Sequence, residues 1–528
     1  MQSRYLLFFI AILLLGCAKR NRPTGGPKDE SAPIMVSTKP PYKTVNFKSD
    51  EIRIYFDEYI KLKDVSTQLV VSPPLKYPAE ITPLGTPSKY INIKIADTLK
   101  ENTTYTFNFG QSIIDNTEGN ILTNFKYIFS TGPVIDSLAI KGTIRDAFND
   151  KADEFVTIML YEANDTYTDS IVYKEKPLYV GNTLDSIAWE ITNIKAGKYM
   201  LVALNDASKN YIFNPKEDKI GFVRDTITIP TEEEYELTLF KEILPYELKR
   251  PSVASQKRLI FGYQGIVDSI KIKALNVGPD FKYTTTFEKD KDTLNYWYSG
   301  VEADSLHFIV ENKKISDTVA VRLLSKNKDS LTITTNARGV LPLRDSLMVR
   351  SNIPLQRIDT TKFKLIRSDS IAVPYTAKIS KSLTDVLFDF EKMHNERYKL
   401  EILPEGISDF YGHVNDTLQI NFNIKQPADY GSLYFKLENV KSYPILVQLT
   451  TLKGQVIETI AANQAQEFAF LNLTPSKYKM RVIYDTNANG KWDTGNYLLK
   501  IEPETVIYYP KEIEVRANWD PTETFILK

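Results

Sequence analysis

The residues whose types and spacing best fit a chemical role form the run 485–493. Oxygen-bearing side chains stand at its first, third, fifth and ninth positions, and a glycine stands at the sixth. Calcium prefers a ring of hard oxygen ligands, and a glycine at the sixth position allows the sharp turn that such a ring needs. The spacing therefore predicts a calcium site. The predicted ligands are Asp485, Asn487, Asn489, the carbonyl of Lys491, and Asp493.

A plain hairpin is the alternative for this loop. Its twelfth position, where calcium loops usually carry a bidentate glutamate, holds Asn496, and Glu502 or Glu504 could substitute from the next predicted strand. Asparagine and glycine also favour tight turns through bonds between side chain and backbone. An earlier copy of the loop, at residues 206–211, has lost the glycine and one amide, which favours the hairpin.

Residue types that support catalysis are sparse. The three histidines, His307, His394 and His413, are far apart, and their spacing assembles neither a zinc cluster nor a serine–histidine–aspartate set. No glycine-rich phosphate loop follows a predicted strand. Acidic pairs such as Asp57 with Glu58 are expected on a solvated surface, because a quarter of all residues are charged. We therefore predict a protein that is not an enzyme, with calcium as its sole candidate cofactor.

The first seventeen residues have the organisation of a lipoprotein signal. Arg4 precedes an apolar run over residues 6–15, which is too short to span a bilayer, and small Gly16 precedes Cys17, the only cysteine. The arrangement resembles a bacterial lipobox. It implies that residues 1–16 are a signal peptide and that Cys17 is acylated. An ordinary signal peptide with an incidental cysteine is the alternative.

The next residues are predicted to be a lipidated tether, 17–32, because proline, glycine and charge dominate there. Its start and its Pro-Thr-Gly-Gly-Pro spacer resemble lipoproteins of the Bacteroidetes group. Ala18 is not the aspartate associated with inner-membrane retention, so the resemblance implies anchoring in the outer membrane. The basic residues Lys19, Arg20 and Arg22 favour a periplasm-facing position over the cell surface.

Composition narrows the class of partner and of fold. The 528 residues include 66 Lys and Arg and 66 Asp and Glu, so no net charge attracts nucleic acid. The 31 tyrosines and 26 phenylalanines favour strands. The length is sufficient for several domains. We expect an all-β chain whose partners are the membrane, through the lipid anchor, and an unknown protein or glycan of the cell envelope.

Alternating apolar residues predict short antiparallel strands over residues 33–132, and strands at this spacing indicate a β-sandwich. The alternation is clearest at Ile52, Ile54 and Phe56, at Ile91, Ile93 and Ile95, at Tyr105, Phe107 and Phe109, and at Phe125, Tyr127 and Phe129. Together with the turn at 114–120 and the closing residues 129–131, this segment resembles the bacterial Ig-like domain of surface-layer proteins.

Residues 137–242 begin a second kind of module. Their segments 138–144, 156–161 and 194–202 resemble the small prealbumin-like sandwiches of collagen-binding adhesins and of carboxypeptidase regulatory domains. The resemblance implies a stalk or spacer.

Both kinds of module recur along the chain. The strand at 197–202 returns at 476–481, and the turn after Asp115 returns after Asp409. These repeats predict a second Ig-like domain at 341–427 and a second prealbumin-like sandwich at 428–528. Between the two pairs, residues 243–340 are predicted to form a strand-rich domain whose family the sequence does not indicate.

Two aromatic runs, 296–298 and 508–509, offer a possible binding surface for a glycan or a peptide. Because side chains alternate between the faces of a strand, we expect these rings mainly in the core. The leading hypothesis is an outer-membrane lipoprotein that serves as a non-catalytic scaffold, spacer or adhesion-type binding module. An accessory protein of envelope assembly or uptake, binding a glycan or an outer-membrane partner, is the second, and an envelope hydrolase is the third.

Overall fold

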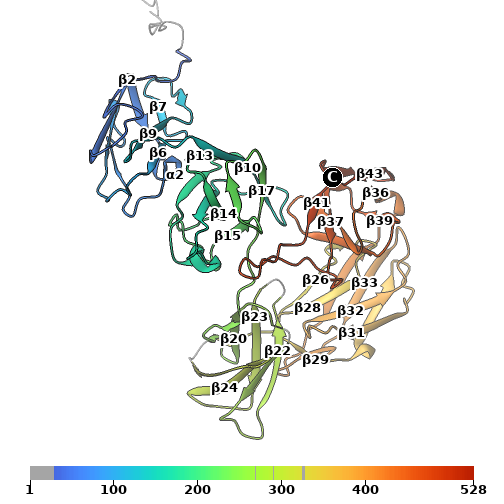
Figure 1. Ribbon diagram of the computed structural model, residues 1–528. Coiled ribbons are helices and arrows are strands. Elements are labelled where there is room, and N and C mark those ends of the chain that lie inside the picture. Colours follow the sequence, from blue (N-terminus) through green and yellow to red (C-terminus); the bar gives the residue numbers. More distant parts are fainter. Residues whose placement is uncertain (1–28, 268, 289–290, 324–326, 528) are drawn as a thin grey trace, which may run out of the picture. The chain divides into compact units, whose positions relative to one another are not determined.

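The computed structural model describes residues 29–527 except 268, 289–290 and 324–326 (Figure 1). The predicted signal peptide, Cys17 and most of the predicted tether lie outside the described residues. Strands hold 49% of the residues and helices 3%, which confirms the predicted all-β class. Within the part of the chain that is described, no helix is long and apolar enough to cross a membrane.

The chain forms two compact units. The first contains the described residues within 1–144, 153–212 and 222–237, and the second contains those within 145–152, 213–221 and 238–528. The segments 145–152 and 213–221, which include the end of β10 (Leu138–Asp146) and most of β15 (Lys219–Phe222), thus belong to the second unit.

The first sandwich has a sheet in the order β4-β5-β2-β7-β8, with β1 also paired to β2, and a second sheet β3-β6-β9. The long strand β2 alternates buried and exposed side chains, as its period-two sequence requires. Its core joins isoleucines of β2 and β5 to aromatic rings of β6 and β9. The strands are β1 (Met35–Lys39), β2 (Glu51–Leu62), β3 (Val70–Ser72), β4 (Glu80–Thr82), β5 (Ser88–Lys94), β6 (Thr104–Asn108), β7 (Ile113–Asp115), β8 (Ile121–Leu122) and β9 (Lys126–Ser130), with the short helix α2 (Val65–Gln68) after β2.

The second sandwich pairs a sheet β13-β10-β17 with a sheet β12-β11-β14-β15, to which β16 is joined through β14. Strand β11 is almost wholly apolar because both of its faces are covered, as its burial pattern shows. The strands are β10 (Leu138–Asp146), β11 (Thr157–Glu162), β12 (Tyr179–Asn182), β13 (Ala188–Ile194), β14 (Gly197–Asn205), β15 (Lys219–Phe222), β16 (Ile227–Ile229) and β17 (Glu234–Leu239), with the 3-10 turn η1 (Asp169–Tyr173).

The middle domain is also a two-sheet sandwich, with orders β18-β20-β23-β22 and β21-β24-β25, and with β19 paired to β20. Phe261, Tyr296 and Phe308 pack edge to face or tilted in its core. The strands are β18 (Glu247–Leu248), β19 (Ser252–Ser255), β20 (Arg258–Gln264), β21 (Ile270–Ala274), β22 (Lys282–Phe287), β23 (Thr293–Ser299), β24 (Ser305–Asn312) and β25 (Ile315–Arg322).

The next sandwich begins earlier than the sequence indicated. β26 (Ile333–Thr335) pairs with β28 (Leu347–Ser351), and β27 (Gly339–Val340) pairs in parallel with β35 (Leu418–Asn423). Both early strands therefore belong to this sandwich, and the boundary predicted at residue 340 is corrected. Alternation marks a segment as a strand but does not say which sheet the strand joins.

This sandwich repeats the first one. Its sheets run β26-β28-β32-β31 and β27-β35-β33-β30, and β29 pairs with β34. β28 and β29 together take the place of the single long β2: β28 pairs with β32 as β2 pairs with β5, and β29 pairs with β34 as β2 pairs with β7. The remaining strands are β29 (Leu355–Ile358), β30 (Phe363–Arg367), β31 (Tyr375–Ile379), β32 (Asp385–Phe390), β33 (Arg397–Ile402) and β34 (Ile407–Asp409), with the 3-10 turn η2 (Thr360–Lys362).

The last sandwich repeats the second one. Its sheets run β39-β36-β43 and β38-β37-β40-β41, with β42 paired to β40, which is the arrangement of β13-β10-β17 and β12-β11-β14-β15 with β16. The strands are β36 (Gly431–Glu438), β37 (Ile445–Thr451), β38 (Val456–Ala462), β39 (Glu467–Leu473), β40 (Ser476–Tyr484), β41 (Val506–Tyr508), β42 (Ile513–Val515) and β43 (Thr522–Ile526), with the 3-10 turn η3 (Pro427–Asp429) before them.

Candidate functional site

The predicted calcium ligands lie on the loop between β40 and β41. Asp485, at the end of β40, is only 2% exposed. One of its carboxylate oxygens accepts the backbone N–H of Asn489 at 3.0 Å, and the other accepts that of Gly490 at 2.9 Å. Gly490 has a φ of +78°, the left-handed conformation for which glycine has no steric cost. The sharp turn expected at the sixth position is therefore present.

Three of the predicted ligands converge. The amide nitrogen of Asn487 lies 2.6 Å from Oδ2 of Asp493, and that of Asn489 lies 2.5 Å from the same oxygen. The oxygen and nitrogen of an asparagine amide are assigned by the hydrogen bonds that they make. In the present orientation the side-chain oxygens of Asn487 and Asn489 accept the N–H groups of Asn489 and Lys491, at 3.2 and 3.0 Å. A calcium ion would therefore need both amides to turn over and give up these bonds before their oxygens could join the Asp493 carboxylate as ligands.

Glu504 closes the other side of the loop. It is 7% exposed, and Oε1 accepts both the backbone N–H and the hydroxyl of Thr486, at 2.7 and 2.8 Å. Oε2 accepts the N–H of Asp493 at 3.0 Å. One of the two candidate glutamates thus reaches the loop, and its carboxylate accepts hydrogen bonds from Thr486 and Asp493. Among the described residues, no group of three or more His, Cys, Asp or Glu side chains surrounds a possible metal position. The calcium site stays a prediction.

We predict that the full chain binds one calcium ion weakly in this loop, with a Kd on the order of 10⁻⁴ to 10⁻³ M, because only two of the predicted side-chain ligands carry charge. Millimolar calcium should then stabilise the last sandwich by roughly 0.4 to 1.4 kcal/mol. Calorimetric titration of calcium into chelator-treated protein measures the affinity. Asp493→Ala should abolish binding, and Lys491→Ala should not, because it keeps the backbone carbonyl. An unchanged titration in Asp493→Ala would contradict the site.

The same loop docks on residues 145–152. The turn after β10 is shaped by Asp146, whose Oδ1 accepts the N–H groups of Phe148 and Asn149. The Phe148 ring lies 4.7 Å from the Trp492 ring and 4.1 Å from the guanidinium of Arg481. The Tyr508 hydroxyl donates to the Phe148 carbonyl at 2.9 Å. We call Phe148, Arg481, Trp492 and Tyr508 the Phe148 clasp.

Arg481 can occupy the clasp because its charge is solvated by other groups. It is 4% exposed, and its guanidinium donates to Oε1 of Gln448 at 2.8 Å and to the Tyr508 hydroxyl at 3.0 Å. Trp492 is held from the loop side, where its indole N–H donates to the carbonyl of Glu504 at 2.9 Å. The Arg481 guanidinium and the Trp492 indole are therefore each held in position by contacts other than those with the Phe148 ring.

A second set of contacts joins the loop to residues 240–242. The Thr494 hydroxyl donates to the Lys241 carbonyl at 2.7 Å, and the N–H of Tyr497 donates to Oε1 of Glu242 at 2.6 Å. Burial raises the pKa of the Glu242 carboxyl, and the Tyr497 N–H opposes that rise. A Cβ atom at Gly495 would lie 2.8 Å from the Phe240 ring, so only glycine allows this approach without a shift. The candidate metal loop is thus also a junction between distant parts of the chain.

The repeated turns of the two Ig-like sandwiches are built on buried aspartates. Asp115 is 1% exposed and accepts the N–H groups of Thr117, Glu118 and Asn120. Asp409 is fully buried and accepts the N–H groups of Tyr411 and His413 and the Nδ1 atom of His413, at 2.8 to 2.9 Å. These carboxylates order their turns, as the sequence repeat predicts.

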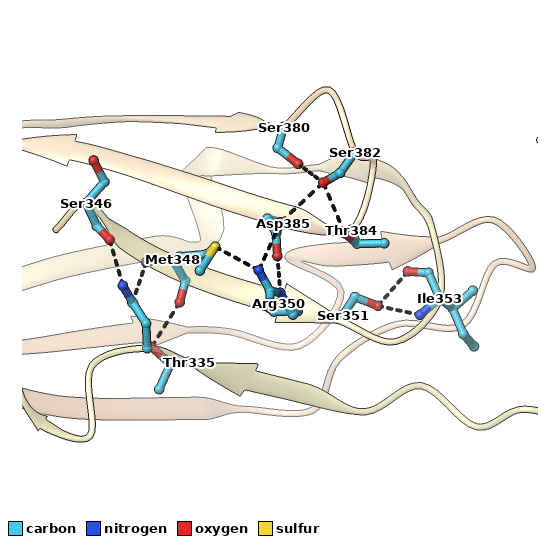
Figure 2. Close-up of polar contacts among 11 residues, drawn as sticks. Thr335, Ser346, Met348, Arg350, Ser351, Ile353, Ser380, Ser382, Thr384 and Asp385 are labelled. Carbon is cyan, nitrogen blue, oxygen red and sulfur yellow. Dashed lines mark hydrogen bonds and ion pairs between the residues drawn. The ribbon is translucent and has the colours of Figure 1, made fainter. Parts of the chain in front are cut away.

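Figure 2 shows a cluster of hydroxyl and charged groups on the sheet of β28 and β32. Arg350 and Asp385 are directly paired across these strands, and Nε lies 2.6 Å from Oδ1. The Ser382 hydroxyl lies 2.6 Å from that of Ser380 and 3.2 Å from Oδ2 of Asp385. Side chains in this cluster bond to one another across the strands and at the β31–β32 turn, which fits a role in strand pairing.

The three histidines differ in exposure and pairing, and the aromatic run 296–298 is buried. His307 and His394 are exposed, whereas His413 is paired with Asp409, an association that sequence spacing did not reveal. Tyr296, Trp297 and Tyr298 are each at most 2% exposed, so this run is core, as expected. A pocket beside Tyr411 collects Lys257, Lys282 and Lys328 from separate segments, and no sequence signal points to it.

Residues 29–131 match the family model described as bacterial Ig-like domain, which confirms the resemblance inferred for this part of the chain. No curated protein matches the chain. Similar solved structures include the major pilin subunit BcpA of Bacillus cereus, at 10% identity and a TM-score of 0.15, covering 74% of this chain and 99% of that one. The surface layer protein SbsC, domains 1-6, is 11% identical with a TM-score of 0.15 and covers 92% and 67%. The BSP domain of a biofilm associated protein is 8% identical with a TM-score of 0.16 and covers 89% and 96%.

Proposed function

We propose that this chain is a lipid-anchored, non-catalytic scaffold or adhesion-type binding protein of the bacterial cell envelope. The bacterial Ig-like match and the recurrence of two sandwich types support a modular architecture in which each unit adds length or surface. The observation that carries the proposal is that the chemically distinctive side chains of the described residues hold the fold together. The Asp115 and Asp409 carboxylates order turns, and the Phe148 clasp joins two parts of the chain.

The anchor of the proposed scaffold is Cys17. Acylation after removal of residues 1–16 would hold the chain on the outer membrane, facing the periplasm, with the following residues as spacer. One acyl chain anchors only marginally, so stable attachment needs more than one.

We predict that Cys17→Ser converts the membrane-bound protein into an unprocessed or soluble form, because serine offers no thiol for acylation. Fractionation of cell envelopes and intact-mass measurement of the N-terminus check this result. Ala18→Ser, which changes the neighbouring residue by one oxygen atom, is the matched control and should fractionate as wild type. A Cys17→Ser protein that is processed and stays bound to the membrane would contradict the anchor, while leaving the modular architecture unaffected.

A further inference from the structure

A polar pocket opens where the middle domain meets the second Ig-like sandwich, inside the second unit. Its volume is about 400 Å³. One wall comes from the β19–β20 turn with Lys257, from Lys282 at the start of β22, and from Lys328. The other wall comes from the turn after β34, with Tyr411 and His413. Pockets at domain junctions are common ligand sites, because two surfaces can converge there.

The pocket carries surplus positive charge. Lys257, Lys282 and Lys328 are exposed, and none of them forms an ion pair with a described residue. The one acidic side chain of the lining, Asp329, is already engaged: it accepts the Ser255 hydroxyl at 2.5 Å and lies 3.5 Å from the Arg258 guanidinium. Three uncompensated ammonium groups around one concavity attract an anion, and this attraction weakens as salt screens it.

The far wall of the pocket is held in place across the junction. The Tyr411 hydroxyl donates to the Lys257 carbonyl at 2.7 Å, and its ring lies 6.3 Å from the ring of Trp297. The Arg258 guanidinium also lies over the Trp297 ring, with its carbon 5.0 Å from the ring centroid. Burial raises the pKa of the Tyr411 hydroxyl, which stays a hydrogen-bond donor. The pocket therefore exists without requiring a ligand to assemble it.

His413 is aimed by a buried carboxylate. Its Nδ1 atom lies 2.9 Å from Oδ2 of fully buried Asp409, so Nδ1 carries a ring proton toward that carboxylate. Nε2 is then the ring atom left for a ligand. Gly412, between these residues, has a φ of +84°, and no atom lies within 4 Å of the position of a Cβ there, so the mouth stays open.

We propose that this pocket binds an acidic saccharide, whose carboxylate, sulfate or phosphate group contacts the lysines. The negative charge of the anionic group complements the positive charge of the three lysines. The neutral hydrogen-bonding groups of Ser299, Gln256 and Gln356 match sugar hydroxyls, and the partly exposed rings of Phe410 and Tyr411 give the apolar surface on which a sugar ring rests. A run of acidic residues would satisfy the lysines but presents no apolar ring face to Phe410 and Tyr411. The assignment goes beyond the proposed scaffold role and does not depend on Cys17.

The test titrates the full chain with a uronic-acid oligosaccharide at low salt, followed by calorimetry. The neutral glucose oligosaccharide of equal length, inorganic phosphate and an oligoglutamate peptide are titrated in parallel. We expect the uronic-acid oligosaccharide to bind at least about tenfold more tightly than each of the other probes. Lys257→Ala combined with Lys282→Ala should weaken it at least about tenfold, because charge-assisted bonds are lost. Binding should also fall as salt rises.

Lys271→Ala combined with Lys273→Ala is the matched control. It removes two exposed lysines from β21 of the same domain, outside the pocket, and should bind as wild type. Equal loss in both double variants would overturn the pocket assignment. Equal binding of the neutral oligosaccharide would overturn the role of charge. Phosphate binding as tightly would mean a free-oxyanion site, and a preference for oligoglutamate would mean a peptide site; either result would overturn the saccharide. Hydrogen exchange of the folded variants verifies that the domains are intact.

Discussion

Replacing Asp115 with alanine is expected to lower the free energy of unfolding of the first Ig-like sandwich by about 3 kcal/mol at neutral pH. The carboxylate accepts three backbone N–H groups of its own turn, at 2.5, 2.8 and 2.9 Å, and alanine leaves all three without an acceptor. Hydrogen exchange of the full chain, followed peptide by peptide, isolates the effect on this sandwich. Exchange at wild-type rates in β2 and β7 would contradict the structural role of Asp115.

The pH dependence gives a second signature of Asp115. Burial by itself raises the pKa of the Asp115 carboxyl, but the N–H groups of Asn120, Glu118 and Thr117 outweigh it and hold the pKa below its ordinary value. The charged form is thus favoured by folding, so its stabilisation is complete above the unfolded-state pKa of about 3.9. It is lost as the pH falls through the lower folded-state pKa. Wild type and Asp115→Ala should therefore converge in stability in acid. Asp115→Asn, which keeps an oxygen acceptor, should lose less at neutral pH.

Replacing Phe148 with alanine is expected to weaken the docking of the β40–β41 loop by about 2–3 kcal/mol. The ring lies 4.7 Å from the Trp492 ring at an interplanar angle of 45°, and it covers the Arg481 guanidinium at 4.1 Å. Burial of the ring, the aromatic contact and the partly desolvated cation each contribute on the order of 1 kcal/mol. Residues 485–504 should then exchange hydrogen and be cleaved by protease faster than in wild type, with the other sheets unchanged.

Two variants bracket the Phe148 prediction. Phe148→Leu keeps apolar contact but lacks the face that attracts the cation, so it should lie between wild type and alanine. Phe287→Ala removes a ring that is 56% exposed on β22 and should change stability by no more than about 0.5 kcal/mol. Loop protection in Phe148→Ala equal to that in Phe287→Ala would show that the clasp does not hold the loop.

Much of the fold was predictable because the local alternation of apolar and polar residues marks a strand. The alternation at Ile52, Ile54 and Phe56 corresponds to three buried side chains of β2, and the family match at 29–131 bears out the Ig-like resemblance. The boundary at residue 340 failed for a physical reason. β26 reads as a strand in the sequence, but its partner, β28, is chosen by hydrogen bonding and by the core that closes over Ile333.

The candidate sites divide in the same way. The two bonds that the Asp485 carboxylate accepts reach no further than Gly490, so residue type and spacing predicted that turn directly. The Glu504 contact was within reach of the sequence because Glu504 lies in the same loop, just before β41.

What the sequence by itself determined is the set of structures governed by neighbours: strands, tight turns at aspartate and glycine, the repeat of two sandwich types, and the resemblance of the segment at Cys17 to a lipobox. Only the tertiary structure decided which distant groups meet. It placed Phe148 against Arg481 and Trp492, and it drew Lys257, Lys282 and Lys328 around one pocket with His413. The physical reason is that residue types and their spacing determine local hydrogen bonds. Packing between sheets instead follows from shape and burial summed over the whole core, to which any one residue contributes little information.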